Sequence, residues 1–154
     1  MRKKVISILG ILLLIGIITS AIIYLQPKKF KLDEKYYNEG KFLDVSGNEL
    51  ANMVENKESF ILFEYNYFCA FRVPCEDIFK EAFKDLKIDV NQISYDEFKE
   101  TKLHEKVKYA PSIILVKKGK VVKYLDASKD EDKVRYQDTL EFKNWIKEYI
   151  EVGA

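Results

Sequence analysis

Apolar and polar positions divide this chain into an N-terminal apolar run and a longer region in which strand and helix patterns alternate. Residues 60–63 form a continuous apolar run, which is typical of a strand buried on both faces of a sheet. The predicted strands are 42–45, 60–63, 88–93, 112–116 and 121–125, and helices are predicted to begin near 46, 75, 94 and 138. This order, β-α-β-α-β-α-β-β-α, predicts an α/β fold with a mixed sheet and helices on both faces.

The predicted helices carry start signals and apolar stripes. Ser94 to Glu97 and Asp138 to Glu141 have the spacing of a capping box, in which the first and fourth residues satisfy each other's main-chain N–H groups. Apolar residues recur with a helical period between Cys75 and Leu86, which predicts one buried face. The final helix is expected to bury Phe142, Trp145, Ile146 and Tyr149. Lys117 to Lys120 predict a hairpin turn, and residues 126–133 predict a charged loop.

The apolar run from Val5 to Leu25 predicts a membrane anchor. Its 21 uncharged residues correspond to a helix of roughly 31 Å, enough to cross the hydrocarbon core of a bilayer. Basic residues at 2–4 favour a cytoplasmic N-terminus, although lysines beyond the run weaken that bias. A cleavable signal peptide is the alternative, but the run is longer than the usual apolar region and no clear Ala-x-Ala site follows it. We therefore predict a basic end and anchor over 1–25, a stalk over 26–41 and a globular domain over 42–154.

Composition limits the functions that the domain can have. Residues 30–154 hold 21 basic and 25 acidic residues, and this net charge of −4 argues against nucleic-acid binding, which needs a basic face. His104 is the only histidine and there are two cysteines, too few for a four-ligand structural zinc site. The sequence also contains no phosphate-binding glycine loop. We therefore predict no metal and no other cofactor, and we expect the chemistry to come from the cysteines.

Both cysteines, Cys69 and Cys75, lie where the strand at 60–63 runs into the next predicted helix. A pair that can form a disulfide suits an oxidising compartment, so we place the domain on the extracytoplasmic side of the membrane. Cys75 is expected at a helix N-terminus, where aligned main-chain N–H groups favour a thiolate. Arg72 would support the thiolate with positive charge, whereas the acidic residues at 76 and 77 oppose it. The helix position therefore favours Cys75 as the more readily ionised thiol.

Two segments resemble the thioredoxin superfamily, over roughly residues 42–152. The first holds Phe68-Cys69 and Pro74-Cys75, and the second is Tyr109-Ala110-Pro111-Ser112, followed by a β-rich run and a Lys-Gly hairpin. In that superfamily the redox cysteines lie where a strand meets a helix and face a cis proline. The resemblance implies a thioredoxin-like three-layer sandwich and a cis Ala110–Pro111 bond. It also implies that Ala110 and Pro111 bind substrate, with the Ala110 main chain pairing with an extended polypeptide. A structural turn proline is the alternative for Pro111.

The cysteine spacing departs from the superfamily pattern. The ordinary Cys-x-x-Cys motif would place a cysteine at position 72, where this chain has Arg72, and the spacing here is Cys-x5-Cys. Either Arg72 replaces the first motif cysteine, or Cys69 is that cysteine and the loop has gained three residues. We prefer the insertion, because Phe68-Cys69 resembles the aromatic-Cys step of the motif. The superfamily attacks with its N-terminal cysteine, so the insertion assigns Cys69 as attacking and Cys75 as resolving, while the helix position alone favours attack by Cys75.

Three functions fit these features. The first is thiol–disulfide exchange on secreted or envelope proteins through Cys69 and Cys75. The second is a non-catalytic accessory or binding module of an envelope complex. For this second function, the chain is similar to membrane-anchored thioredoxin-like proteins of Gram-positive bacteria, such as bacteriocin-transport accessory proteins, which would use the fold as a binding platform. The third is a purely structural disulfide, which would stabilise the fold by about 2.4 kcal/mol.

Two further polar residues are expected to lie in solvent. The resemblance places the buried acid of the superfamily nearer Phe63, so Glu64 is expected to be solvated. His104 lies in a charged helical stretch and is expected to be exposed. Neither is therefore assigned to the site.

Overall fold

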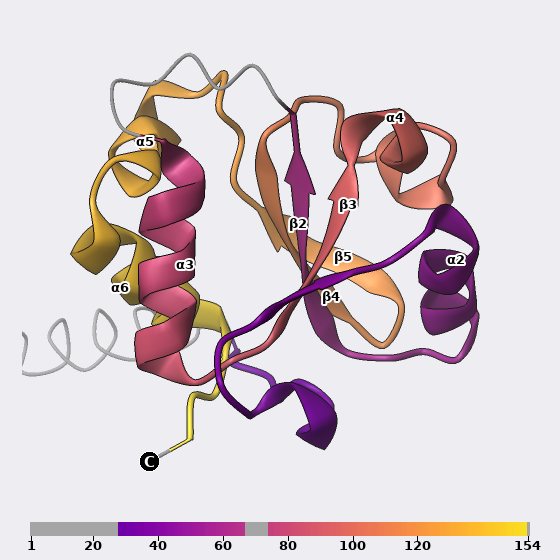
Figure 1. Ribbon diagram of the computed structural model, residues 1–154, viewed down its shortest axis with the longest axis horizontal. Coiled ribbons are helices and arrows are strands. Elements are labelled where there is room, and N and C mark those ends of the chain that lie inside the picture. Colours follow the sequence, from indigo (N-terminus) through magenta and orange to yellow (C-terminus); the bar gives the residue numbers. More distant parts are fainter. Residues whose placement is uncertain (1–27, 67–73, 154) are drawn as a thin grey trace, which may run out of the picture.

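A computed structural model describes residues 28–66 and 74–153 of the protein (Figure 1). The strands are β1 (Phe42–Asp44), β2 (Phe60–Tyr65), β3 (Val90–Ser94), β4 (Ser112–Lys117) and β5 (Lys120–Tyr124). The α-helices are α2 (Gly47–Glu55), α3 (Cys75–Leu86), α4 (Tyr95–Phe98), α5 (Asp130–Lys133) and α6 (Thr139–Tyr149). Three 3-10 turns are η1 (Glu34–Tyr36), η2 (Lys102–Glu105) and η3 (Val134–Tyr136).

The five strands form one mixed sheet in the order β1-β3-β2-β4-β5. β1, β3 and β2 are parallel to one another, whereas β4 is antiparallel to both β2 and β5. The central strand β2 is buried over residues 60–64, as its apolar run predicted. Figure 1 shows α3 and α6 on one side of the sheet and α2 and α4 on the other. The predicted mixed sheet with helices on both faces is confirmed, and the fold is thioredoxin-like α/β.

Aromatic rings attach α3 and α6 to the sheet. The ring of Phe79 on α3 lies 5.5 Å from that of Phe63 on β2 and 4.5 Å from that of Phe142 on α6, measured between centroids. Trp145 stacks on Phe142 at 6.0 Å. Such ring pairs add geometry-dependent attraction to the burial of a large apolar area. Most of the apolar stripe predicted for each helix is buried, whereas Ile78, Leu86 and Tyr149 are partly exposed.

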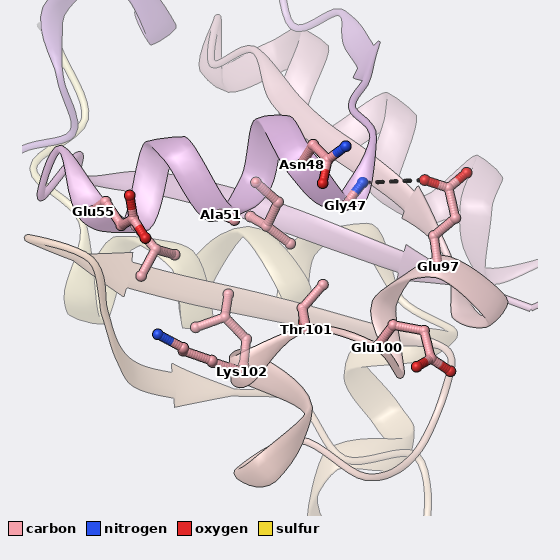
Figure 2. Close-up of a pocket in the computed structure, with 11 residues that line it drawn as sticks. Gly47, Asn48, Ala51, Glu55, Glu97, Glu100, Thr101 and Lys102 are labelled. Atoms are coloured by element: carbon pink, nitrogen blue, oxygen red, sulfur yellow. Dashed lines mark hydrogen bonds between the residues drawn. The ribbon is translucent and has the colours of Figure 1, made fainter.

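On the opposite side of the sheet, a glutamate side chain joins α4 to α2. Ser94 accepts a hydrogen bond from the N–H of Glu97, which is half of the predicted capping box. The Glu97 carboxylate instead accepts from the N–H of Gly47, at 3.1 Å (Figure 2). The second half of the predicted box therefore links two helices.

Residues 30–37 belong to the folded domain, which differs from the stalk predicted over 26–41. The N–H of Phe30 donates to the carbonyl of Tyr149 at 2.8 Å, and the N–H of Glu151 donates to the carbonyl of Phe30 at 2.9 Å. The apolar side chains of this segment are buried: Phe30, Leu32 and Tyr36. The first two are two residues apart and the last two are four apart, so no single strand or helix period covers all three, and the sequence pattern did not reveal their burial.

Across the residues that the structure describes, no helix is both long and apolar enough to cross a membrane. The predicted anchor at residues 5–25 lies outside those residues, so it stays a prediction.

The segment after β5 is folded, although the sequence predicted a charged loop over 126–133. It forms α5 and then η3 before α6 begins. Tyr136 of η3 is buried, and its ring contacts Phe79 of α3. The segment is therefore packed against the helix that begins with Cys75.

Candidate functional site

Cys75 is the first residue of α3, and 2% of it is exposed. Pro74 precedes it with φ of −56°. Proline suits the start of a helix, because its restricted φ is compatible with helical geometry and it lacks a main-chain N–H. Cys75 thus lies at the positive end of the helix dipole, where a thiolate is favoured. The predicted position of Cys75 at a helix N-terminus is confirmed.

Ala110 and Pro111 lie immediately before β4, and the bond between them is cis, as the resemblance implied. Pro111 is buried, Ala110 is partly exposed and Tyr109 is 59% exposed. The hydroxyl of Ser112 donates to the carbonyl of Leu125 at 2.5 Å, which ties the start of β4 to the end of β5. The chain therefore passes from solvent into the sheet at Ala110.

Tyr136 connects Pro111 to the helix of Cys75. Its hydroxyl donates to the Pro111 carbonyl at 2.8 Å, and its ring lies 5.5 Å from that of Phe79, one helical turn after Cys75. Burial raises the pKa of Tyr136 well above its usual value, and the nearby acidic groups of Asp132 and Cys75 raise it further. The phenol therefore stays protonated and can donate this hydrogen bond at ordinary pH. No sequence pattern indicated Tyr136, because one aromatic residue among polar neighbours has no period.

Glu64 is buried, and the prediction that it is solvated is wrong. It is the fifth residue of β2 and is 0% exposed. Neither of its carboxylate oxygens has a hydrogen-bond partner among the described residues, and burial raises the pKa of Glu64 to about 8. In the sheet register it lies directly opposite Ser112 of β4, the residue after Pro111. An acidic group that is mostly protonated at neutral pH therefore lies at the end of the sheet that carries Pro111.

A signal for the burial of Glu64 is present in the sequence. The apolar run before it predicts a strand buried on both faces, and such a strand has no solvated side for the residue that follows. Phe63, near which the resemblance placed the buried acid, packs its ring against Phe79. The buried acid of β2 is therefore Glu64.

Two buried aspartates brace the segment that carries Tyr136. Asp132 accepts a hydrogen bond from the N–H of Asp126 at 3.0 Å and forms an ion pair with Arg135. Asp126 accepts from the N–H and the hydroxyl of Ser128, at 3.0 and 2.6 Å. Buried carboxylates need such partners, because an unpaired charge is costly to remove from water. We call Asp126, Ser128, Asp132 and Arg135 the carboxylate clasp.

Cys69 and Arg72 lie outside the described residues. The Cys69–Cys75 disulfide, the three-residue insertion and the support of a thiolate by Arg72 therefore stay predictions.

A separate cleft of about 290 Å³ lies between α2 and the α4–η2 segment (Figure 2). Its lining includes apolar Leu50 and Leu103 and acidic Glu100. Cys75 and Pro111 do not line it, so it is distinct from the site around Cys75.

His104 is partly buried rather than exposed as predicted. Its ring lies 5.9 Å from those of Tyr95 and Phe98. Within residues 28–66 and 74–153, no group of three or more His, Cys, Asp or Glu side chains could hold a metal ion.

The sequence matches no protein-family model and no curated protein. The structure is similar to solved thioredoxins. A mutant thioredoxin from Halobacterium salinarum is 20% identical, with a TM-score of 0.49, and the match covers 76% of this chain and 97% of that chain. Thioredoxin f from spinach chloroplast is 16% identical, with a TM-score of 0.47 and coverage of 78% and 98%. Thioredoxin from Trypanosoma brucei brucei is 14% identical, with a TM-score of 0.46 and coverage of 77% and 99%. The thioredoxin-like fold is defined by the strand order and connections of the chain itself.

Proposed function

We propose that this chain is a thioredoxin-like thiol–disulfide oxidoreductase, with Cys69 and Cys75 as its redox pair. The observation that carries the proposal is the position of Cys75 as the first residue of α3, beside a tyrosine that is bonded to Pro111. A helix N-terminus favours the thiolate, which is the form that attacks a disulfide. Arg72 adds a positive charge three residues before Cys75.

The exchange moves two electrons between a client disulfide and the cysteine pair. The Cys69 thiolate attacks one sulfur of the client disulfide, forms a mixed disulfide and releases the other client sulfur as a thiolate. The Cys75 thiolate then attacks the Cys69 sulfur and releases the second client thiolate. The client is reduced and Cys69–Cys75 is oxidised, and the reverse sequence oxidises a client dithiol.

Glu64, in the fraction of molecules in which its carboxyl is ionised, is suited to accept the proton that Cys75 loses when it attacks. A general base works best when its pKa lies near the operating pH, and burial brings the pKa of Glu64 to about 8. Its place opposite Ser112 puts the carboxyl at the Pro111 end of the sheet. The proton returns to the cysteine when the disulfide is reduced again.

Clients are proposed to bind along Ala110 and Pro111. Ala110 is partly exposed immediately before β4, so its main chain can pair with an extended polypeptide in the manner of an added strand. Main-chain pairing accepts many side chains, which suits an enzyme with varied protein clients.

We place this activity on the outer face of a bacterial membrane, with residues 5–25 as the anchor. The support is the length of the uncharged run and the presence of two cysteines that can form a disulfide. The clients are then secreted or envelope proteins.

A non-catalytic accessory or binding module with a structural disulfide is the second candidate. It is favoured by the near-complete burial of Cys75 and by Arg72 at the position of a motif cysteine. This function requires a Cys69–Cys75 bond that does not turn over.

A redox titration of the full chain in detergent separates these two functions. The protein is equilibrated in thiol–disulfide buffers of stepped potential, trapped with a maleimide and digested with trypsin. Cleavage after Arg72 puts Cys69 and Cys75 on different peptides, so mass spectrometry reports whether a bond joins them. We expect a midpoint potential above about −300 mV.

A midpoint well below about −300 mV would identify an inert structural bridge and would favour the binding module. The Cys75→Ala variant is the control, because it cannot form the bond at any potential.

A further inference from the structure

Tyr136 makes three interactions that converge on the exchange site, although the proposed chemistry assigns it no role. Its hydroxyl donates to the Pro111 carbonyl, its ring packs on Phe79, and it interacts electrostatically with Cys75. The tyrosine is fully buried, so solvent does not compete for these contacts. Tyr136 thus links α3, through the contact of its ring with Phe79, to the main chain at Pro111, through its hydroxyl.

We propose that the Tyr136 hydroxyl is a positioning group for polypeptide clients, which holds the Pro111 carbonyl inside the protein and thereby orients the exposed main chain of Ala110. The inference rests on the proposed thiol–disulfide exchange and deepens it. A peptide unit is planar, so holding the Pro111 carbonyl sets the whole Pro111–Ser112 unit. The Ser112 hydroxyl, bonded to the carbonyl of Leu125, holds the next residue. Pro111 and Ser112 are thus both held by hydrogen bonds, and they fix the direction in which the main chain of Ala110 leaves the sheet.

The carboxylate clasp holds Tyr136 in place. Asp132 binds the N–H of Asp126 and the guanidinium of Arg135, the residue directly before Tyr136. The clasp therefore holds η3 against the residues that follow β5. Without it, η3 would lose the ion pair and the main-chain hydrogen bond that tie this segment to the end of β5.

Two large apolar side chains that are close in the sequence to the residues of this hydrogen bond are exposed to solvent. Tyr109 lies two residues before Pro111 and is 59% exposed, and Val134 lies two residues before Tyr136 and is 49% exposed. The client class that we propose is an extended polypeptide, because its main chain can pair with the exposed main chain of Ala110.

Tyr37 provides a matched control. Its hydroxyl also donates to a main-chain carbonyl, that of Glu151, at 2.7 Å. It pairs with Ile88, which follows the C-terminal end of α3, whereas Cys75 begins that helix. Tyr37→Phe thus removes the same chemical group at the far end of the helix.

The test compares two disulfide probes with the full chain in detergent. Insulin is a polypeptide disulfide, and dithiobis(nitrobenzoic acid) is a small aromatic disulfide that has no polypeptide main chain. We expect Tyr136→Phe to lower the rate constant for insulin about tenfold, because a misplacement of about 1 Å can cost on the order of a hundredfold and the shift of the Pro111 carbonyl should be smaller than that. The rate constant for the small disulfide should stay within about twofold, and Tyr37→Phe should leave both within about twofold.

Asp132→Ala is a second variant, which leaves the tyrosine hydroxyl present but removes the clasp. We expect the same selective loss with insulin, while the circular dichroism spectrum of the folded protein is unchanged. If Tyr136→Phe does not fold, this variant decides the question.

Three results would overturn the inference while leaving the proposed function intact. These are an equal loss with both probes, no loss with either, and the same loss in Tyr37→Phe. If the unmodified chain reacts with neither probe, the proposed function itself fails and the inference fails with it. The behaviour of the unmodified chain therefore separates the two failures.

Discussion

Glu64 of β2 lies directly opposite Ser112 of β4, so a buried carboxyl group lies next to the point where Pro111 enters the sheet. The two residues are far apart in the sequence and are brought together only by the antiparallel pairing of β2 with β4. Since burial raises the pKa of Glu64 to about 8, this group changes its protonation near neutral pH. Its substitution therefore reports on both the stability and the chemistry of the site.

Replacing Glu64 with Gln should stabilise the protein at high pH and have little effect at low pH. The pKa of Glu64 rises from 4.5 in its ordinary state to about 8 in the folded protein. Between these values the folded state keeps a proton that the unfolded chain loses, so stability falls as the pH rises through this window. The full loss, on the order of 5 kcal/mol, is reached above the folded pKa. Gln carries no such proton, and urea unfolding at about pH 4 and about pH 9 measures the difference.

The control for this prediction is Glu148→Gln on the exposed side of α6. It should behave like the unmodified protein at both pH values. A stability difference between Glu64→Gln and the unmodified protein that is the same at both pH values would contradict the prediction, because it would arise from packing and not from ionisation.

Trp145→Ala should destabilise the protein by about 3–5 kcal/mol, since it removes a buried indole and leaves a cavity. Trp145 is 1% exposed and stacks on Phe142, which in turn contacts Phe79 of α3. Chemical denaturation measures the loss. Leu140→Ala on the same helix is the control, because Leu140 is 61% exposed, and its effect should stay within about 0.5 kcal/mol. A loss below about 1 kcal/mol for Trp145→Ala would show that α6 contributes little to the stability of the sheet.

Cys75→Ala should accumulate mixed disulfides with client proteins in cells. If Cys69 attacks and Cys75 resolves, the reaction stops after the first step once the resolving thiol is missing. Cys69→Ala should capture few clients, because Cys75 is almost completely buried. Non-reducing gels followed by reduction count the captured proteins. The opposite pattern would assign the attack to Cys75 at the helix N-terminus, and capture by neither variant would argue for the binding module.

A cysteine introduced at Lys120 should react with a membrane-impermeant maleimide in intact cells. Lys120 is exposed at the start of β5, and Cys69 and Cys75 are replaced by alanine in this experiment so that only one thiol is present. Labelling is expected because we place the domain outside the cytoplasm. If labelling requires cell lysis, the domain lies inside, and the compartment argument for a disulfide is lost.

Several features of the fold and site follow from local patterns in the sequence. The apolar run at 60–63 identified β2, because a strand buried on both faces is continuously apolar, and the helical stripe after Cys75 identified α3, because one buried helix face repeats with a period of 3.6 residues. Proline before Cys75 and the Asp138 cap marked helix starts for reasons that involve only neighbouring residues. The sequence alone thus determined the order of the strands and of α2, α3, α4 and α6, and it placed Cys75 at a helix N-terminus.

The tertiary structure decided the polar interior. Whether Glu64 is solvated depends on what β4 and β3 place around it, and the hydrogen bond from Tyr136 to Pro111 joins residues 25 positions apart. The clasp is built from aspartates, which are equally common in solvated loops, so composition cannot distinguish a buried clasp from a solvated loop. Burial of a polar group depends on partners that come from other elements, and local periods contain no information about which distant residues will meet. For this reason the helix start that holds Cys75 was predictable and the apolar run before Glu64 held a signal for its burial, whereas the tyrosine and the clasp became visible only in the folded chain.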